Sequence, residues 1–305
     1  MRYDVNDEFP QVREVWKKNF GANIAAGFAV NQDNAFFPLA CGAMLSVSLK
    51  NGSVKWRKDF PGKIYSTPAL SGKYLVFGCS DGNIYALNAS DGTLKWKFQT
   101  GKAVLASPVI LDGKVFIGGS DGAFRCIELK TGKAVWTYGN VEGHAVSTPY
   151  ADGERVIFGT WGGKLYSLDS ETGRENWVWS VGKASKMYSP ASTLPLYSSG
   201  MVFVAVPDRQ VYAIDAATGR QLFRVKEAGM RYVSEVTALQ FIPRKCSEGP
   251  TLFLPMCSCL QGRRSRIPAR PGWLTTTPAM TLPRPLCQKG TESCISRQTR
   301  AISLP

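Results

Sequence analysis

The stretch Ala86-Leu87-Asn88-Ala89-Ser90-Asp91-Gly92-Thr93-Leu94-Lys95-Trp96 decides the fold. It predicts the end of one strand, a tight turn and the start of a second strand, because aspartate and glycine suit a turn that needs positive φ. A glycine four residues before an aromatic residue recurs at Gly52–Trp56, Gly92–Trp96, Gly132–Trp136, Gly173–Trp177 and Gly219–Phe223. The aromatic positions are 40, 40, 41 and 46 residues apart, and Trp16 lies a further 40 residues upstream of Trp56. A period of this size predicts a repeat architecture.

Within one period, four short apolar runs alternate with turn residues. The second full repeat has such runs at 66–70, 74–78, 83–87 and 94–98, separated by Ser71-Gly72, Asp81-Gly82 and Asp91-Gly92. Runs of this length bounded by turns are typical of strands, and no helical periodicity competes with them. Val12 to Trp16 is a further strand candidate. The chain is therefore predicted to be all-β, with four antiparallel strands in each repeat.

A four-stranded unit of this kind cannot bury both of its faces alone. Units stacked side by side around an axis bury them against one another, which is the β-propeller arrangement. We expect an incomplete propeller of about five to six blades. The recurring aromatics are predicted to pack between neighbouring blades, since such rings cover a large apolar area, rather than to stack on a substrate. These blade-docking residues are Trp16, Trp56, Trp96, Trp136, Trp177 and Phe223.

Composition divides the chain into three parts: a polar N-terminal segment at 1–11, repeats at 12–228 and a non-repeat tail at 229–305. Residues 240–305 hold nine of the 18 prolines and five of the eight cysteines, but no aspartate. They also carry 10 basic and two acidic residues, so much of the net charge of +14 comes from this region and does not indicate nucleic-acid binding. We consider two explanations: a disordered basic tail, and, preferred here, out-of-frame translation, which would leave the propeller truncated.

The cysteines of the repeats and those of the tail give separate expectations. Cys41, Cys79 and Cys126 replace small or apolar residues of other repeats and are expected to be buried free thiols. The tail cysteines form no Cys-x-x-Cys pair, so no zinc site is predicted.

The pattern Ala86-x-Asn88-x-x-x-Gly92-x-x-x-Trp96 resembles the tryptophan-docking motif of the PQQ-like (quinoprotein-type) β-propeller repeat family, in which PQQ is pyrroloquinoline quinone. The resemblance covers about residues 12–226 and does not extend to WD40 repeats. It implies one of three roles. The favoured role is a non-catalytic scaffold of the BamB-like branch that binds a protein or a ligand in the bacterial cell envelope. The alternatives are a fragment of a PQQ-dependent dehydrogenase and the sensor propeller of a multidomain metallophosphoesterase or kinase.

Several features of the sequence disfavour an enzyme. Quinoprotein dehydrogenases have more blades and a vicinal disulfide, whereas this chain has no Cys-Cys dipeptide. No catalytic residue and no metal site is predicted, because the aspartates fall in turns and His144 is the only histidine. No cofactor is expected; PQQ with calcium would apply only to the dehydrogenase alternative.

Four basic residues precede the strand-opening prolines at similar distances: Lys63, Lys102, His144 and Lys183. They could ring one mouth of the central channel and attract an acidic protein or an anionic small ligand. Solvated loop charges are the simpler explanation and are preferred from the sequence alone. By resemblance the protein is expected to be periplasmic or otherwise extracytoplasmic. The sequence contains no apolar run of membrane-spanning length, and its first residues do not resemble a signal peptide.

Overall fold

A computed structural model describes residues 14–180, 189–206 and 210–226, together with three short strands further along the chain. The chain divides into two compact units, residues 1–237 and 238–305. In the described part of the first unit, five antiparallel sheets of four strands each follow one another in chain order. These sheets are the blades of a β-propeller, and the all-β prediction is confirmed.

Each blade uses four consecutive strands, ordered from the inner to the outer edge. The first two blades are β1 Ala29–Val30, β2 Asn34–Pro38, β3 Ala43–Ser48, β4 Val54–Asp59 and β5 Ala69–Ser71, β6 Tyr74–Gly78, β7 Asn83–Asn88, β8 Leu94–Gln99. The third and fourth are β9 Val109–Leu111, β10 Lys114–Gly118, β11 Phe124–Glu128, β12 Ala134–Tyr138 and β13 Tyr150–Ala151, β14 Arg155–Gly159, β15 Lys164–Asp169, β16 Glu175–Ser180. The fifth is β17 Leu196–Ser198, β18 Met201–Val206, β19 Gln210–Asp215 and β20 Gln221–Lys226, preceded by a short 3-10 helix η1 at Pro190–Ser192.

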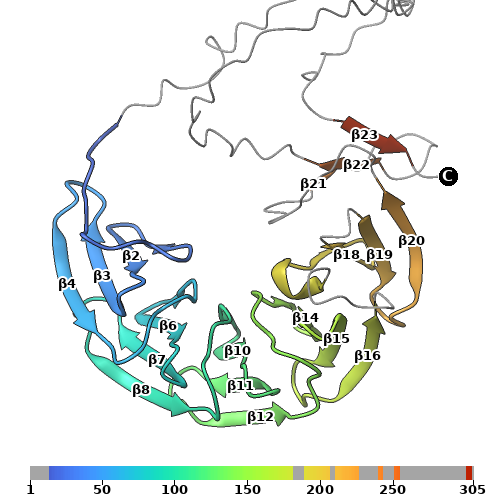
Figure 1. Ribbon diagram of the computed structural model, residues 1–305, viewed down its shortest axis with the longest axis horizontal. Helices are drawn as coiled ribbons and strands as arrows, with labels where there is room; N and C mark the ends of the chain where they lie inside the picture. The colour runs from blue at the N-terminus through green and yellow to red at the C-terminus, as the bar shows by residue number, and fades with distance from the viewer. Residues whose placement is uncertain are drawn as a thin grey trace, which may run out of the picture. The chain divides into compact units, whose positions relative to one another are not determined.

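The blades of the first unit stand side by side along an arc. Figure 1 shows the outer strands β4, β8, β12, β16 and β20 on its convex side. The inner strands β1, β5, β9 and β13 contact one another in chain order. Two hydrogen bonds join these inner edges: the Gly27 N–H donates to Thr67 Oγ1 at 2.9 Å, and the Thr67 N–H donates to Ser107 Oγ at 2.9 Å. The repeat therefore stacks through its backbone as well as through its side chains.

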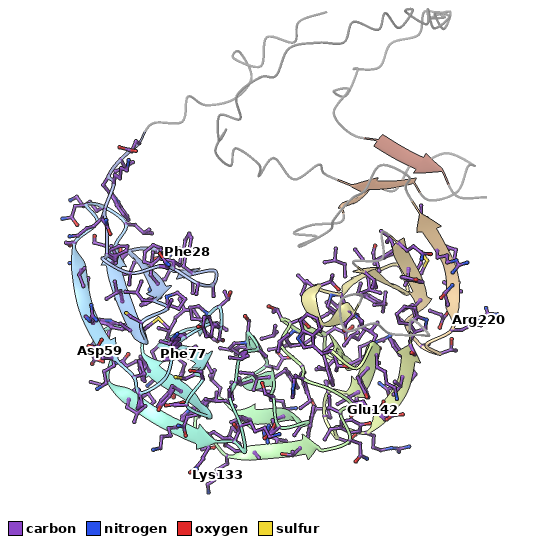
Figure 2. All side chains as sticks on the ribbon, viewed as in Figure 1. Phe28, Asp59, Phe77, Lys133, Glu142 and Arg220 are labelled. Atoms are coloured by element: carbon purple, nitrogen blue, oxygen red, sulfur yellow. The ribbon has the colours of Figure 1, made fainter. Side chains whose placement is uncertain are left out.

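The hydrophobic core lies in layers between neighbouring blades. In the second blade, Leu75, Val76 and Phe77 are all fully buried, although successive side chains point to opposite faces of the sheet. Val76 packs in the cluster shared with the third blade, and Phe77 in the cluster that contains Phe36 of the first blade. Figure 2 shows Phe77 among the packed side chains, with Lys133 on the convex side. Burial of both faces explains why these strands read as continuous apolar runs.

Each recurring tryptophan packs on the turn glycine of the next blade. The Trp96 indole is 8% exposed, its Nε1–H donates to the Leu129 carbonyl at 2.7 Å, and a Cβ atom added to Gly132 would lie 2.6 Å from its Cγ. Such contact requires glycine, which also has a φ of +72° there. The same arrangement holds at Trp16–Gly52, Trp56–Gly92, Trp136–Gly173 and Trp177–Gly219. Phe223 occupies the equivalent position in the fifth blade, where its ring centroid lies 6.4 Å from that of Phe203.

A β-bulge precedes the docking aromatic in every described blade. In the second blade Ala86 pairs with Trp96, but Leu87 pairs with Leu94, so Lys95 is the extra residue. The register shifts at the same place in the other four blades. A bulge bends the strand and re-aims its side chains. Here it brings the aromatic ring onto the neighbouring blade.

Two details of the first blade differ from the sequence prediction. The strand expected at Val12 to Trp16 does not form over residues 14–16, because no described strand pairs with them; residues 12–13 lie outside the described range. Trp16 nevertheless packs on Gly52 and donates to the Leu49 carbonyl at 2.7 Å. Cys41 is exposed rather than buried, since it lies in the turn just before Gly42, whereas Cys79 and Cys126 are buried free thiols.

The second unit contains a small antiparallel sheet. Its strands are β21 Gln240–Ile242, β22 Thr251–Leu254 and β23 Arg300–Ser303, in that order. Phenylalanine, isoleucine and threonine favour strands, although the sequence suggested no strands of useful length here. The hypotheses of a disordered tail and of out-of-frame translation otherwise concern residues outside the described range.

Candidate functional site

One end of the blades carries the candidate site and is here called the loop face. It comprises the loops 60–68, 100–108 and 139–149, which join one blade to the next, and the turns 79–82, 119–123 and 160–163 between the second and third strands. Backbone hydrogen bonds tie the two sets together: the Ser80 N–H donates to the Lys63 carbonyl at 2.9 Å, and the Trp161 N–H donates to the His144 carbonyl at 3.0 Å. These loops are therefore held against the blades that follow them.

The structure places three of the four predicted basic residues on this face. Lys63 and His144 occupy equivalent positions, whereas Lys102 comes one residue earlier, because Ala103 makes the equivalent bond to Ser120. All three basic side chains are exposed. None of them belongs to an ion pair in the described part of the chain. The fourth, Lys183, lies outside the described residues.

The acidic side chains of the loop face, by contrast, have partners nearby. Asp121 binds Arg125, with Oδ2 to Nη2 at 2.5 Å, and both side chains are about 10% exposed. Asp81 accepts a hydrogen bond from the Tyr85 hydroxyl at 2.6 Å. Glu142 pairs with Lys164, and the pair raises the pKa of that lysine. Asp81 keeps its negative charge, because its partner is a neutral hydroxyl. Lys63 and Lys102, which have no ion pair among the described residues, outweigh this single carboxylate, so the loop face has a small surplus of positive charge.

The Asp121–Arg125 pair has a defined effect on protonation. Burial tends to raise the pKa of Asp121, but hydrogen bonds from Arg125 and from the Gly101 N–H outweigh it, so this pKa lies below its usual value. Because folding lowers this pKa, the ionised carboxylate stabilises the folded chain at every pH above the unfolded-state pKa. That stabilisation is lost as the pH falls through the folded-state pKa.

We expect Asp121→Asn to reduce the free energy of unfolding by about 1.5–3 kcal/mol at pH 7, because Arg125 then loses its charged partner. The difference from the native chain should begin to shrink below about pH 4, where the Asp121 carboxyl of the unfolded chain becomes protonated, and should continue to shrink as pH falls toward the lower folded-state pKa. Urea titrations of both chains from pH 7 to pH 3 measure this. A difference that stays constant over that range would contradict the assignment.

Two exposed aromatic residues on the loop face escaped the sequence prediction. Tyr65 is 42% exposed and Trp161 is 39% exposed. Trp161 stands outside the glycine-to-aromatic spacing, at a turn position that carries serine in the second and third blades. That departure from the repeat was the available signal, since an aromatic residue without a docking glycine has no packing role in the motif.

A PQQ-bound calcium ion would require several oxygen ligands gathered in one place. Among the described residues, no group of three or more His, Cys, Asp or Glu side chains could hold a metal ion. The turn aspartates act locally instead: Asp91 accepts from Thr93, Asp169 from Thr172 and Asp215 from Thr218, and these bonds lower the pKa of each carboxyl. The described residues therefore do not fit such a centre.

The fold and the docking contacts define the class: a β-propeller whose blades are joined by tryptophan packed on glycine. A family model described as outer membrane protein assembly factor BamB matches residues 10–139, 69–187 and 142–239. The chain belongs to this family of PQQ-like repeat proteins. No curated protein was found to match the chain.

Three solved structures share the fold. BamB from Moraxella catarrhalis is 22% identical, with a TM-score of 0.60, over 69% of this chain and 64% of that one. The quinohemoprotein alcohol dehydrogenase ADHIIG from Pseudomonas putida HK5 is 16% identical, with a TM-score of 0.59, over 69% and 43%. That of Comamonas testosteroni is 14% identical, with a TM-score of 0.58, over 67% and 43%. The chain thus spans about two thirds or less of each relative, and these identities show the fold alone.

In the described part of the chain, no helix has the length and hydrophobicity needed to cross a membrane.

Proposed function

We propose that this chain is a non-catalytic scaffold of the bacterial cell envelope that binds an acidic protein partner, or an anionic small ligand, on its loop face. The observation that carries the proposal is the charge imbalance there: Lys63, Lys102 and His144 are exposed without an ion pair among the described residues, whereas Asp121 and Glu142 have basic partners. Asp81, whose partner is the neutral Tyr85 hydroxyl, offsets only part of this positive charge. Exposed charges of one sign attract partners of the other sign and raise their rate of association.

A location outside the cytoplasm is supported by the family, which is named for a factor in outer membrane protein assembly. Exposed Tyr65 and Trp161 add aromatic surface to the loop face. Aromatic side chains are enriched in protein interfaces, because one part of the ring system can be buried while polar groups find partners. This combination favours a protein over a small ligand.

Charge reversal tests the proposal. The full chain should retain a partner from bacterial envelope extracts, and Lys63→Glu/Lys102→Glu should reduce that retention by about tenfold or more at low salt. The matched control is Lys55→Glu/Lys97→Glu, which makes the same change in net charge on exposed outer-strand positions. Equal retention by both double variants, or no specific partner for the native chain, would contradict the proposal.

The fold that the chain shares with two quinohemoprotein alcohol dehydrogenases favours the dehydrogenase alternative. Among the described residues, however, no group of three or more His, Cys, Asp or Glu side chains could hold a metal ion. The dehydrogenase alternative has its own test, in which PQQ and calcium are added to the full chain. A bound chromophore together with alcohol- or sugar-dependent reduction of a dye would overturn the scaffold proposal. A sensor propeller within a multidomain protein would be supported by an in-frame catalytic domain in the gene.

A further inference from the structure

The first blade has one side that faces no other described blade. Its opposite side carries Phe36 and Met44, which pack in one cluster with Phe77 of the second blade. In each later blade, the side that faces backward along the chain packs against the blade before it. The same side of the first blade is here called the leading side. It carries a buried apolar cluster of six residues: Ala35, Phe37, Leu39, Ala43, Leu45 and Val47.

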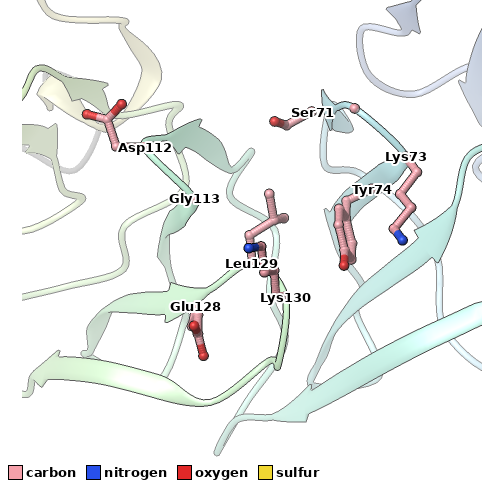
Figure 3. A pocket seen from close by; sticks show the side chains of 9 residues that line it. Ser71, Lys73, Tyr74, Asp112, Gly113, Glu128, Leu129 and Lys130 are labelled. Atoms are coloured by element: carbon pink, nitrogen blue, oxygen red, sulfur yellow. The ribbon is translucent and has the colours of Figure 1, made fainter.

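Figure 3 shows how an interface between two blades covers this kind of surface. Tyr74 of the second blade packs against the apolar cluster that contains Leu129 of the third. Even beside the groove of about 370 Å³ that opens there, Leu129 is only 6% exposed. The carbonyl of Leu129 accepts the hydrogen bond of a docking tryptophan, and Leu49 is the corresponding residue of the first blade. Leu49 is 37% exposed, so the leading side lacks this cover.

Three further apolar residues are exposed along the inner edge of the first blade. Ile24, Phe28 and Val30 are 44%, 53% and 53% exposed. Figure 2 shows Phe28 at the first-blade end of the row of blades. The residues 40 positions later, which occupy the same places in the second blade, are buried or half-buried: Ile64, Pro68 and Leu70. These three side chains of the first blade are therefore exposed because no described blade stands in front of them.

Residues 14–22, here called the cap, cover the remainder of the leading side. Trp16, Phe20 and Ala22 pack against its apolar cluster, and the Phe20 ring lies 5.4 Å from the Phe37 ring. Trp16 takes the place of the docking tryptophan of a preceding blade. Its Nε1–H donates to the Leu49 carbonyl at 2.7 Å, and its ring lies against the turn glycine of the first blade. The cap thus supplies the docking aromatic of a blade without its sheet.

The cap is attached to the first blade mainly through side chains. No described strand pairs with residues 14–20. Backbone hydrogen bonds to this blade are described from Asn23 onward, where the Asn23 carbonyl accepts from the Ala40 N–H at 2.8 Å. Segments with few backbone hydrogen bonds open at a lower free-energy cost than the strands of a sheet. The cap can therefore separate from the first blade while the blades stay folded.

We propose that the cap blocks self-association, and that its release exposes a docking surface for a second copy of this chain. The surface consists of the apolar cluster of the leading side together with Ile24, Phe28 and Val30. A contiguous apolar surface of this kind fits a partner that is equally apolar. The leading side of a second copy meets that requirement, because two identical patches can pack about a two-fold axis.

The cap accounts for a monomer in its closed state. Three side chains at about half exposure offer far less than the roughly 800 Å² per partner that a stable interface buries. Terminal units that cover the last apolar face keep other repeat proteins soluble in the same way. This role is separate from the loop face and does not depend on the function proposed for that face.

Two substitutions release the cap by different routes. Trp16→Ala removes the ring and its hydrogen bond to the Leu49 carbonyl. Gly52→Ala keeps the ring but adds a Cβ atom that would lie 2.8 Å from its Cε3. Sedimentation velocity of the full chain over an about fiftyfold range of concentration should show a native monomer. Both variants should approach about twice the native mass at the highest concentration.

Gly72→Ala is the matched control for Gly52→Ala. Gly72 has a φ of +54° and Gly52 a φ of +68°, so both alanine variants carry backbone strain. Nothing lies within 4 Å of the Cβ atom that Gly72 would gain. The Gly72→Ala chain should therefore remain monomeric. Far-UV circular dichroism checks that every chain compared keeps the native strand content.

Charges placed on the leading side test where the two copies meet. Adding Phe28→Glu/Val30→Glu to the Trp16→Ala chain should restore the monomer, because carboxylates of the two copies would then face each other. The matched control adds Val54→Glu/Leu94→Glu, which places the same charges on exposed apolar residues of the outer strands β4 and β8. This control should dimerise like the Trp16→Ala chain itself.

Three results would overturn the proposal. The first is a native chain that already dimerises. The second is a monomer at every concentration for the folded Trp16→Ala and Gly52→Ala chains, which would mean that another part of the same chain covers the leading side. The third is association of the Trp16→Ala chain that the added Phe28→Glu/Val30→Glu charges do not weaken.

Discussion

Trp96→Ala is expected to reduce the free energy of unfolding by about 3–5 kcal/mol. The indole is 8% exposed, packs on Gly132 of the next blade and donates a hydrogen bond to the Leu129 carbonyl at 2.7 Å. Its removal leaves a cavity between two blades and an unsatisfied carbonyl group, and each of these has a cost. Urea denaturation followed by circular dichroism measures the change.

The control for this substitution is Trp161→Ala. Trp161 is 39% exposed and lies in a turn of the loop face without a docking glycine. Its removal should change stability by no more than about 0.5 kcal/mol. If the two alanine variants had the same stability, tryptophan docking would not be what holds the blades together.

Gly132→Ala is expected to cost about 2–4 kcal/mol, the sum of two effects. The backbone of Gly132 has a φ of +72°, which strains any residue with a Cβ atom. The added Cβ would also lie 2.6 Å from Trp96 Cγ, so that the ring would have to move. Thermal and urea unfolding of the variant give the cost.

Gly113→Ala separates the strain from the clash. Gly113 has the same φ of +72°, but nothing lies within 4 Å of the Cβ that it would gain. Its alanine variant should show only the backbone cost of about 1–2 kcal/mol. A loss of stability for Gly132→Ala no larger than that for Gly113→Ala would show that the ring moves away without penalty.

The four strands of each repeat, and the packing of neighbouring blades against one another, were predictable from the residues. A glycine four residues before an aromatic residue, repeated about every 40 residues, allows few other packings. The bulge between Ala86 and Leu87 was not predictable, because the same spacing fits a regular hairpin. The exposure of Cys41 could have been predicted, because Cys41 directly precedes Gly42 as Asp81 precedes Gly82, which is a polar turn position of the repeat.

The residues of the candidate site were harder to predict from the sequence than the fold, and the reason is physical. The loops between blades differ in length, so counting back from proline placed Lys102 one residue away from the position equivalent to Lys63.

The central claim is that the repeated tryptophan is a blade-docking residue that acts through the glycine of the next blade. A double-mutant cycle of Trp96→Ala and Gly132→Ala, measured by urea denaturation, tests it most directly. Once the ring is gone, the Cβ at position 132 has nothing to displace, so the double variant should be more stable than the sum of the single changes predicts by at least about 1 kcal/mol. Additivity within about 0.5 kcal/mol would contradict the claim.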